Sequence, residues 1–240
     1  MTRPVVLFSS GLDSAVLLRH TVQRYGTAQP VYVRSGLAWE GGERAVAERF
    51  LAALPPDSGV LDLVELEVDM RDVYPATHWA VRGEAPAFDS PDEDVYLEGR
   101  NVVLLSKTAV FAARNGSQKI LMGPLAGNPF PDARPEFFAT MARALSLGVN
   151  APIDVETPFI SVHKADVIRL GVTLGVRFDL TLSCMQPVSG EHCGRCSKCR
   201  ERKDAFTEAG MTDPAYAPAT SSFQSPLSNR TATSNFQPNL

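Results

Sequence analysis

The chain has 240 residues, of which 44% are hydrophobic and 21% are charged, proportions close to those of soluble globular proteins. They exclude disorder of the whole chain, and a formal net charge of -4 provides no broad basic surface for nucleic acid. The first apolar run is too short for a signal peptide, and no stretch approaches the ~20 apolar residues of a membrane span. We therefore expect one α/β core with a short appendage, in a cytoplasmic protein.

The first elements alternate between strands and helices. Residues 5–8 form a short apolar run, and a helical pattern of apolar residues then extends to Tyr25. Residues 31–33 and 61–68 are typical of buried strands, with helical spacing over residues 43–54 between them. This β-α-β alternation predicts a parallel sheet with right-handed crossover connections.

The second half continues the alternation. A helix is predicted over residues 102–114 and a strand over 120–122, and two further helices over 137–147 and 164–174. The α/β class therefore extends through most of the chain.

Two stretches lack this periodicity. Residues 70–94 contain three prolines and several carboxylates, which predicts a long loop or flap over one end of the sheet. Residues 210–240 are rich in Ser, Thr, Asn and Pro and are predicted to be a disordered tail. We expect the core to end near Phe206 and residues 212–240 to be dispensable, because such a segment buries too little apolar surface to offset its ordering entropy.

A polar turn separates the first strand from the first helix. Its residues are Ser9, Ser10, Gly11, Leu12, Asp13 and Ser14. Backbone N–H groups and the helix dipole favour a bound anion at such a place. The hydroxyls of Ser9, Ser10 and Ser14 are predicted donors to phosphate, and Asp13 is a predicted ligand of Mg²⁺. The alternative is a polar turn in which Asp13 or Ser14 only caps the helix.

All cysteines of the chain lie close together: Cys184, Cys193, Cys196 and Cys199. Four thiolates are the number that a closed, structural zinc site needs, and their restriction to one segment favours metal binding over disulfides. We expect Arg195, Lys198 and Arg200 to offset the thiolate charge, and His192 to lie beside the site. The alternative is an iron–sulfur cluster, but the ferredoxin spacing requires a further cysteine where this chain has Lys203.

The phosphate turn resembles the Ser-Gly-Gly-X-Asp-Ser signature of the PP-loop ATP pyrophosphatases, with Ser10 in place of the first glycine. In that family the loop grips the β- and γ-phosphates of ATP while a substrate oxygen attacks the α-phosphate. The products are an adenylate and pyrophosphate. The resemblance therefore implies that residues 9–14 bind ATP.

A wider set of motifs resembles the 7-cyano-7-deazaguanine (preQ0) synthase family over residues 4–206. The motifs are the phosphate turn, Gly99-Arg100-Asn101, residues 131–137, Lys164 and the cysteine cluster. The resemblance implies a doubly wound parallel sheet, usually in a homodimer, and a role in queuosine biosynthesis. It also implies conversion of 7-carboxy-7-deazaguanine into a nitrile: ATP activates the carboxylate, ammonia makes the amide, and ATP then dehydrates it.

The same resemblance assigns roles to single residues. Catalysis is assigned to Asp13, Lys164 and Arg100, with Lys164 on the phosphates. Substrate binding is assigned to Arg100, Asn101, Asp132 and Arg134. Each assignment has a plainer alternative, in which Arg100 and Asn101 only begin a helix, Asp132 only caps one, and Lys164 is an exposed first-turn lysine.

The chain departs from the family pattern in two segments. Ser-Gly-Leu-Ala-Trp-Glu at residues 35–40 replaces Asp-Tyr-Gly-Gln-Arg-His, and the segment 127–133 is shorter, with Ala133 in place of a cysteine. Both segments lie where the deazapurine is expected to bind. Trp39 is predicted to pack at a helix start, with pocket lining as the alternative.

These patterns divide the chain into three parts: a PP-loop ATP-binding domain (1–183), a zinc knuckle with a helix (184–209) and the tail (210–240). Two rival functions stay open. One is a PP-loop enzyme that adenylates another carboxylate or a tRNA base. The other is a catalytically silent nucleotide-binding or zinc-mediated interaction module.

Overall fold

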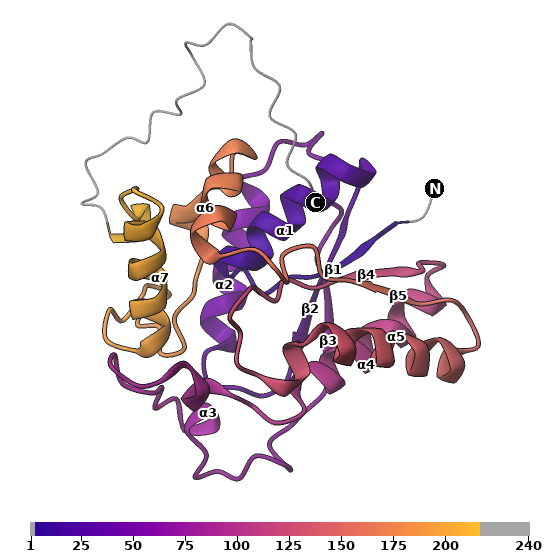
Figure 1. Cartoon of the computed structure of the whole chain (residues 1–240), viewed down its shortest axis with the longest axis horizontal. Helices are drawn as coiled ribbons and strands as arrows, with labels where there is room; N and C mark the ends of the chain where they lie inside the picture. Colours follow the sequence, from indigo (N-terminus) through magenta and orange to yellow (C-terminus); the bar gives the residue numbers. More distant parts are fainter. Residues whose placement is uncertain (1–2, 217–240) are drawn as a thin grey trace, which may run out of the picture.

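A five-stranded parallel sheet forms the centre of the computed structural model, which describes residues 3–216 (Figure 1). The spatial order is β3-β2-β1-β4-β5, so the chain builds outward from β1 in one direction and then in the other. The strands are β1 (Val5–Leu7), β2 (Gln29–Arg34), β3 (Val64–Glu67), β4 (Lys119–Leu121) and β5 (Asp154–Glu156). The predicted α/β class with a parallel sheet is confirmed.

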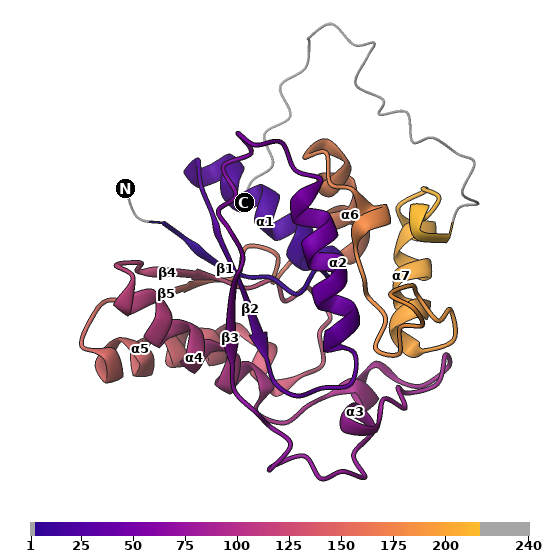
Figure 2. The same ribbon diagram turned by 180° about the vertical axis from the view of Figure 1, so that it is seen from behind.

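Helices cover both faces of the sheet (Figures 1 and 2). The α-helices are α1 (Leu12–Tyr25), α2 (Glu40–Ala52), α3 (Trp79–Arg82), α4 (Arg100–Arg114), α5 (Pro135–Val149), α6 (Lys164–Thr173) and α7 (Ser197–Glu208). Four 3₁₀ turns join them within the described residues: η1 (Asp92–Val95), η2 (Pro131–Ala133), η3 (Phe178–Leu180) and η4 (Pro214–Tyr216). None of the helices in residues 3–216 has the length and apolar character to cross a membrane.

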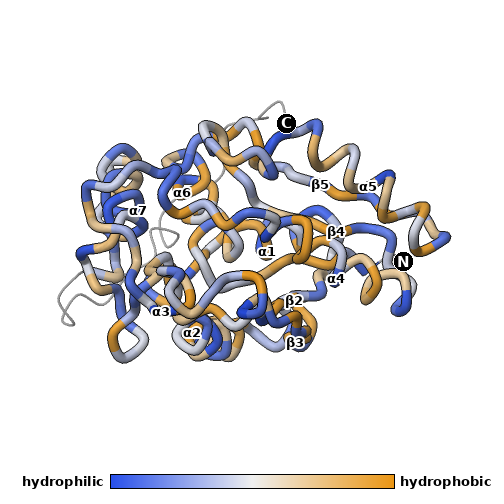
Figure 3. The backbone as a smooth tube through the Cα atoms, turned by 90° about the horizontal axis from the view of Figure 1, so that it is seen from below, coloured by the Kyte–Doolittle hydropathy of each residue, from blue (hydrophilic) through white to orange (hydrophobic). Residues whose placement is uncertain are grey.

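Alternating residues of the strands build two hydrophobic cores. Val6 and Phe8 face one core with α1, α2 and α6, whereas Val5 and Ile120 face the other with α4 and α5. Because helices cover both faces, the central strands β1 and β4 are apolar on both sides. Figure 3 shows the tube near the labels β2 and β4 largely in orange, the hydrophobic end of its scale. The doubly wound arrangement implied by the family resemblance is therefore confirmed.

Strand β5 was not among the predicted elements. It is only three residues long, and its Asp-Val-Glu sequence carries no apolar run. Its pairing with β4, which places Val155 beside Ile120, defines it instead. Such a strand depends on a neighbour that is distant in sequence, so local periodicity does not reveal it.

The stretch 70–94, predicted to be a loop or flap, is packed and contains α3. Trp79 of α3 stacks on the buried Trp39, with ring centroids 5.6 Å apart and planes inclined by 13°. At its other end Arg200 donates hydrogen bonds to the carbonyls of Phe88 (2.9 Å) and Ser90 (2.8 Å). The stretch is thus fixed between the start of α2 and the cysteine-bearing segment, and Arg200, expected to offset thiolate charge, holds it there.

A buried ion pair closes the C-terminal part. Arg202 is 0% exposed; its Nε and Nη2 lie 2.7 and 2.9 Å from the two carboxylate oxygens of Asp213. Arg202 also donates to Thr181 Oγ1 (2.8 Å) and to the carbonyl of Phe178 (2.9 Å). The pair therefore joins α7 to the segment before the first cysteine and to residues after the helix.

This pair corrects two expectations about the tail. Asp213 and η4 lie within residues 210–216, which the prediction assigned to a disordered tail, and Asp213 is buried. The folded part thus extends beyond Phe206, at least to Tyr216, and a deletion from residue 212 would remove the partner of Arg202. The predicted disorder of residues 217–240 lies outside the described residues.

We predict that Asp213→Ala lowers the free energy of unfolding by about 3–5 kcal/mol, because it leaves the Arg202 charge buried and unpaired. Asp179→Ala is the matched control, since it removes an ion pair to Arg177 whose side chains are 53% and 34% exposed. That control should cost about 1 kcal/mol or less. Urea unfolding of both variants measures the difference. Equally small decreases in the free energy of unfolding would contradict the stabilising role of the Arg202–Asp213 ion pair.

Candidate active site

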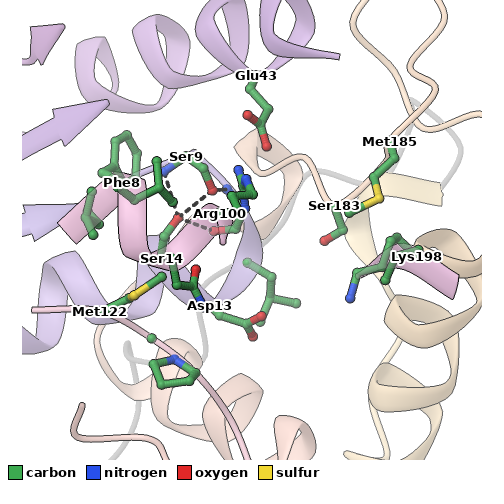
Figure 4. A pocket seen from close by; sticks show the side chains of 18 of the residues that line it. Phe8, Ser9, Asp13, Ser14, Glu43, Arg100, Met122, Ser183, Met185 and Lys198 are labelled. Atoms are coloured by element: carbon green, nitrogen blue, oxygen red, sulfur yellow. Dashed lines mark hydrogen bonds between the residues drawn. The ribbon is translucent and has the colours of Figure 1, made fainter. Parts of the chain in front are cut away.

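The candidate site lies where the strand order reverses, at the carboxyl ends of β1 and β4. A cavity of about 290 Å³ opens there, between the phosphate turn on one side and Ser183, Met185 and Lys198 on the other (Figure 4). A second cavity of about 360 Å³ adjoins it and shares Asp13, Lys164 and Lys198 as lining residues.

The phosphate turn leaves the N-terminus of α1 uncapped. The N-cap residue is Gly11, and no side chain within residues 3–216 accepts a hydrogen bond from the first N–H groups of the helix. Ser14 Oγ instead donates to the carbonyl of Gly11 (3.0 Å) and accepts from the N–H of Ser9 (3.3 Å). The alternative in which Asp13 or Ser14 only caps the helix is therefore not what the geometry shows, and the free N–H groups can meet an anion.

Ser10 adopts the backbone conformation that the family signature reserves for glycine. Its φ is 60°, and the residue is 0% exposed. Its hydroxyl donates to the carbonyl of Glu43 (2.9 Å), and its own carbonyl accepts from the N–H of Leu182 (2.9 Å). The hydroxyl that was predicted to reach phosphate is thus used inside the protein, while Ser9, Gly11, Leu12, Asp13 and Ser14 line the cavity.

Four charged side chains of alternating sign form a continuous series of ion pairs along the walls of the two cavities: Asp13, Lys164, Glu201 and Lys198. Lys164 Nζ lies 3.2 Å from Asp13 Oδ2 and also contacts Glu201, whose second oxygen contacts Lys198. Burial alone would lower the pKa of Lys164, but Asp13 and Glu201 raise it above its ordinary value. Burial would likewise raise the pKa of Glu201, yet Lys164 and Lys198 hold it far below its ordinary value. The chain of charges joins α1, α6 and α7.

Two polar atoms in the cavity lack protein partners. Asp13 Oδ1 and Arg100 Nε are buried and have no hydrogen-bond partner among the described residues. Both residues line the cavity. Burying a carboxylate oxygen or a guanidinium N–H without a partner is costly. A bound cation beside Asp13 Oδ1 and a bound anion beside Arg100 Nε would remove this cost.

The other predicted substrate residues are placed differently. Asn101 lines the cavity, but its N–H donates to Asp132 Oδ2 (3.2 Å) and its Nδ2 donates to the carbonyl of Asp132 (3.0 Å). Asp132 therefore holds the N-terminus of α4 and lies outside the cavity wall. Arg134 is exposed and is not among the lining residues. The structure brings Asp13, Arg100, Asn101 and Lys164 together and leaves Arg134 apart.

The four cysteine sulfurs form a compact cluster, all within 4.8 Å of one another. The Sγ–Sγ distances are 3.8 Å for Cys184 and Cys196, 4.0 Å for Cys193 and Cys199, and 3.5 Å for Cys196 and Cys199. A tetrahedral ion with metal–sulfur distances of ~2.3 Å has edges of ~3.8 Å. The cluster therefore fits one metal ion held by four thiolates. His192 accepts a hydrogen bond from the N–H of Ser183 (3.1 Å) and is not part of the set.

Comparison with protein-family sequence models shows to which family the chain belongs. The sequence model of the family described as "Queuosine biosynthesis protein QueC" matches residues 3–210. The chain belongs to the QueC family.

Individual relatives agree with this family. The 7-cyano-7-deazaguanine synthase of Acinetobacter baylyi is 34% identical over 229 residues, covering 90% of this chain and 96% of the relative. The protein of the same name from Anaeromyxobacter dehalogenans is 34% identical, covering 88% and 94%. A solved structure of a predicted tRNA methyltransferase subunit from Methanocaldococcus jannaschii covers 91% of this chain at 15% identity, with a TM-score of 0.46, too distant to bear on function.

This QueC-family cavity also contains residues that the sequence analysis did not assign to it. Trp39 is both a packing residue and part of the lining, so both of its interpretations hold. Lys198 was assigned to the thiolates, yet it lines both cavities from the first turn of α7. Glu43 was predicted only as the start of a helix, although it lines the cavity together with Arg100. A buried carboxylate is visible only once the fold is known.

We predict that Glu201 stabilises the QueC chain in a pH-dependent way. Because its folded-state pKa is depressed below the ordinary 4.5, its contribution is complete above that pH and is lost as the pH falls toward the folded value. The stability gap between the native chain and Glu201→Gln should therefore narrow by roughly 1 kcal/mol between about pH 7 and about pH 4. Urea unfolding measures it, with Glu208→Gln, an exposed carboxylate, as control; a gap that stays constant or widens would contradict the ion pairs.

Proposed function

We propose that this chain is a 7-cyano-7-deazaguanine synthase that converts 7-carboxy-7-deazaguanine into the nitrile with ATP and ammonia. The observation that carries the proposal is a likeness of 34% identity to relatives of that name over nearly their full length. The cavity supports it, because an uncapped helix N-terminus and unsatisfied cationic and anionic groups meet there.

The chemistry explains why ATP is needed. A nitrile retains the carbon of the carboxylate but neither of its oxygens, and a carboxylate oxygen is a poor leaving group. Transfer of AMP to that oxygen makes it a good one, with pyrophosphate released. Ammonia then displaces AMP to give the amide, and a second ATP activates the amide oxygen for its loss.

We assign the parts of the cavity as follows. The N–H groups at the start of α1 and the ammonium of Lys164 hold the phosphates, which develop charge as pyrophosphate leaves. Arg100 orients the carboxylate toward the α-phosphate. Asp13 holds Mg²⁺ with Oδ1, the oxygen that Lys164 leaves free.

Aromatic side chains support a planar ligand. Tyr96 and Phe130 stack with ring centroids 5.1 Å apart and both line the cavity. A flat heteroaromatic ring gains from contact with such side chains. Phe130 belongs to the segment 127–133 that departs from the family pattern, so the proposal places a ring of ATP or of the deazapurine beside that departure.

We propose further that the four-cysteine cluster holds a structural Zn²⁺. With all ligands from the chain, the ion has no open position for substrate, so its role is to fix the fold of residues 184–199. Those residues carry Met185 and Lys198 into the cavity. The homodimer implied by the family and the cytoplasmic location expected from the sequence stay predictions.

The test of the function is ATP–pyrophosphate exchange with and without 7-carboxy-7-deazaguanine. We predict exchange that depends on this acid, and its loss in Asp13→Ala with little change in melting temperature, because Asp13 serves the phosphates and its partner Lys164 keeps the ion pair with Glu201. Exchange with another acid only would favour a different carboxylate. Absence of exchange under every condition would favour a silent binding module, and full activity of Asp13→Ala would refute the role of the turn.

We predict one zinc ion per chain. Cys196→Ser should lose the metal and lower the melting temperature, because the free energy of metal binding stabilises the folded knuckle. Elemental analysis and thermal unfolding measure both effects. Iron with labile sulfide, or a metal-free native chain of unchanged stability, is the outcome that rejects this site.

A further inference from the structure

Glu43 places a carboxylate inside the cavity. It lies in the first turn of α2, is 9% exposed and lines the cavity wall. Figure 4 shows its side chain directed toward the space between the phosphate turn and the wall formed by Ser183 and Met185. The carboxylate therefore faces the region where an activated substrate would meet a nucleophile.

Hydrogen bonds fix this position. The hydroxyl of Tyr32 donates to Glu43 Oε2 (2.8 Å), and the backbone carbonyl of Glu43 accepts from Ser10 Oγ (2.9 Å). No donor within the described residues lies at hydrogen-bond distance from the other oxygen, Oε1. One oxygen is thus held by the protein, and the other is free to accept a proton.

Glu43 differs from Asp13, Glu201 and Asp92, three other carboxylates that line the two cavities. Asp13 is ion-paired with Lys164, Glu201 is paired with Lys164 and Lys198, and Asp92 is paired with Arg200. Glu43 has no ion pair within 4.0 Å in the part of the chain that the structure describes. Paired carboxylates are weak bases because a neighbouring cation stabilises their charged form.

The surroundings of Glu43 make it a stronger base. Burial raises its pKa to about 7; Arg100 on α4 and the Tyr32 hydroxyl on β2 limit the rise, and Glu40 on the same helix adds to it. A general base works best when its pKa lies near the operating pH. Glu43 thus combines an oxygen without a hydrogen bond, the lack of an ion pair among the described residues and a pKa near the operating pH, the properties that a general base needs.

We propose that Glu43 is the general base of the nitrogen-transfer step. This inference rests on the proposed function. Ammonia attacks the acyl carbon of the adenylate, the C–N bond forms, and the C–O bond to AMP breaks. The attacking nitrogen gives one proton to the Glu43 carboxylate, and AMP leaves with the bonding electron pair. The activated amide loses two N–H protons as it collapses to the nitrile and AMP; the same carboxylate, after it has released its first proton to water, can take one of them, and water takes the other.

The experiment separates adenylation from nitrogen transfer. Nitrile formation and ATP–pyrophosphate exchange are measured for the native chain and Glu43→Gln over about pH 6 to 9, with the concentration of free ammonia held constant. We expect turnover to fall by about 100-fold or more in the variant. The fold-decrease in the exchange rate should be at least about tenfold smaller than the fold-decrease in turnover, since ammonia takes no part in exchange. The limb near pH 7 in the native turnover profile should disappear.

Tyr32→Phe is the second variant and keeps the test decisive if Glu43→Gln folds poorly. It removes a hydrogen bond that lowers the pKa of Glu43, so the limb should move to higher pH. A limb that does not move, or equal losses of turnover and exchange in a folded Glu43→Gln, would overturn the proposal and leave Glu43 a binding or packing residue. Absence of exchange in the native chain would instead refute the proposed function, and this inference with it.

Discussion

The site depends on Ser10, whose hydrogen bonds hold three separate segments in register. Its hydroxyl fixes the first turn of α2 through the carbonyl of Glu43, and its carbonyl fixes Leu182, two residues before the first cysteine. The residue can do this because its positive φ turns the backbone sharply between β1 and α1. Placement of the phosphate turn therefore also places the carboxylate of Glu43 and the entry into the cysteine cluster. A serine in a position suited to glycine gains one further anchoring contact, from its hydroxyl to the carbonyl of Glu43, in exchange for some backbone strain.

Charge organises the same region. The N-terminus of α1, Arg100 and Lys164 supply positive potential for phosphate and carboxylate oxygens, while Asp13 and Glu201 keep Lys164 charged despite its burial. Lys198 extends this arrangement from the cysteine-bearing segment, so the segment whose four thiolates fit a metal ion also places a cation in the cavity. Adenylation needs this environment because negative charge builds on the leaving pyrophosphate. Glu43, with no ion pair among the described residues, is available for a step of the opposite kind, in which a proton must be accepted.

Local sequence patterns predicted the parts of the fold and site that are contiguous in the chain. The phosphate turn, the four cysteines and the helices with clear apolar periodicity are of this kind, and the structure confirms the α/β fold around them. Features that depend on distant pairing were missed: β5 exists because it pairs with β4, and Asp213 is ordered because Arg202 is buried beside it. Asp132 and Arg134 belong to a family motif, yet the packing of η2 against α4 directs the first to Asn101 and leaves the second exposed. Burial, which makes Glu43 a base, is likewise a property of the folded chain.

Isotope transfer shows whether a carboxylate oxygen attacks the α-phosphate of ATP at this cavity. 7-Carboxy-7-deazaguanine carrying ¹⁸O in both carboxylate oxygens is converted with ATP and ammonia, and the nucleotide and phosphate products are examined by mass spectrometry. Attack at the α-phosphate in both activation steps transfers both labels to AMP, one to each of the two AMP molecules released per nitrile. Label in inorganic phosphate, with ADP as the nucleotide product, would show attack at the γ-phosphate and would contradict it.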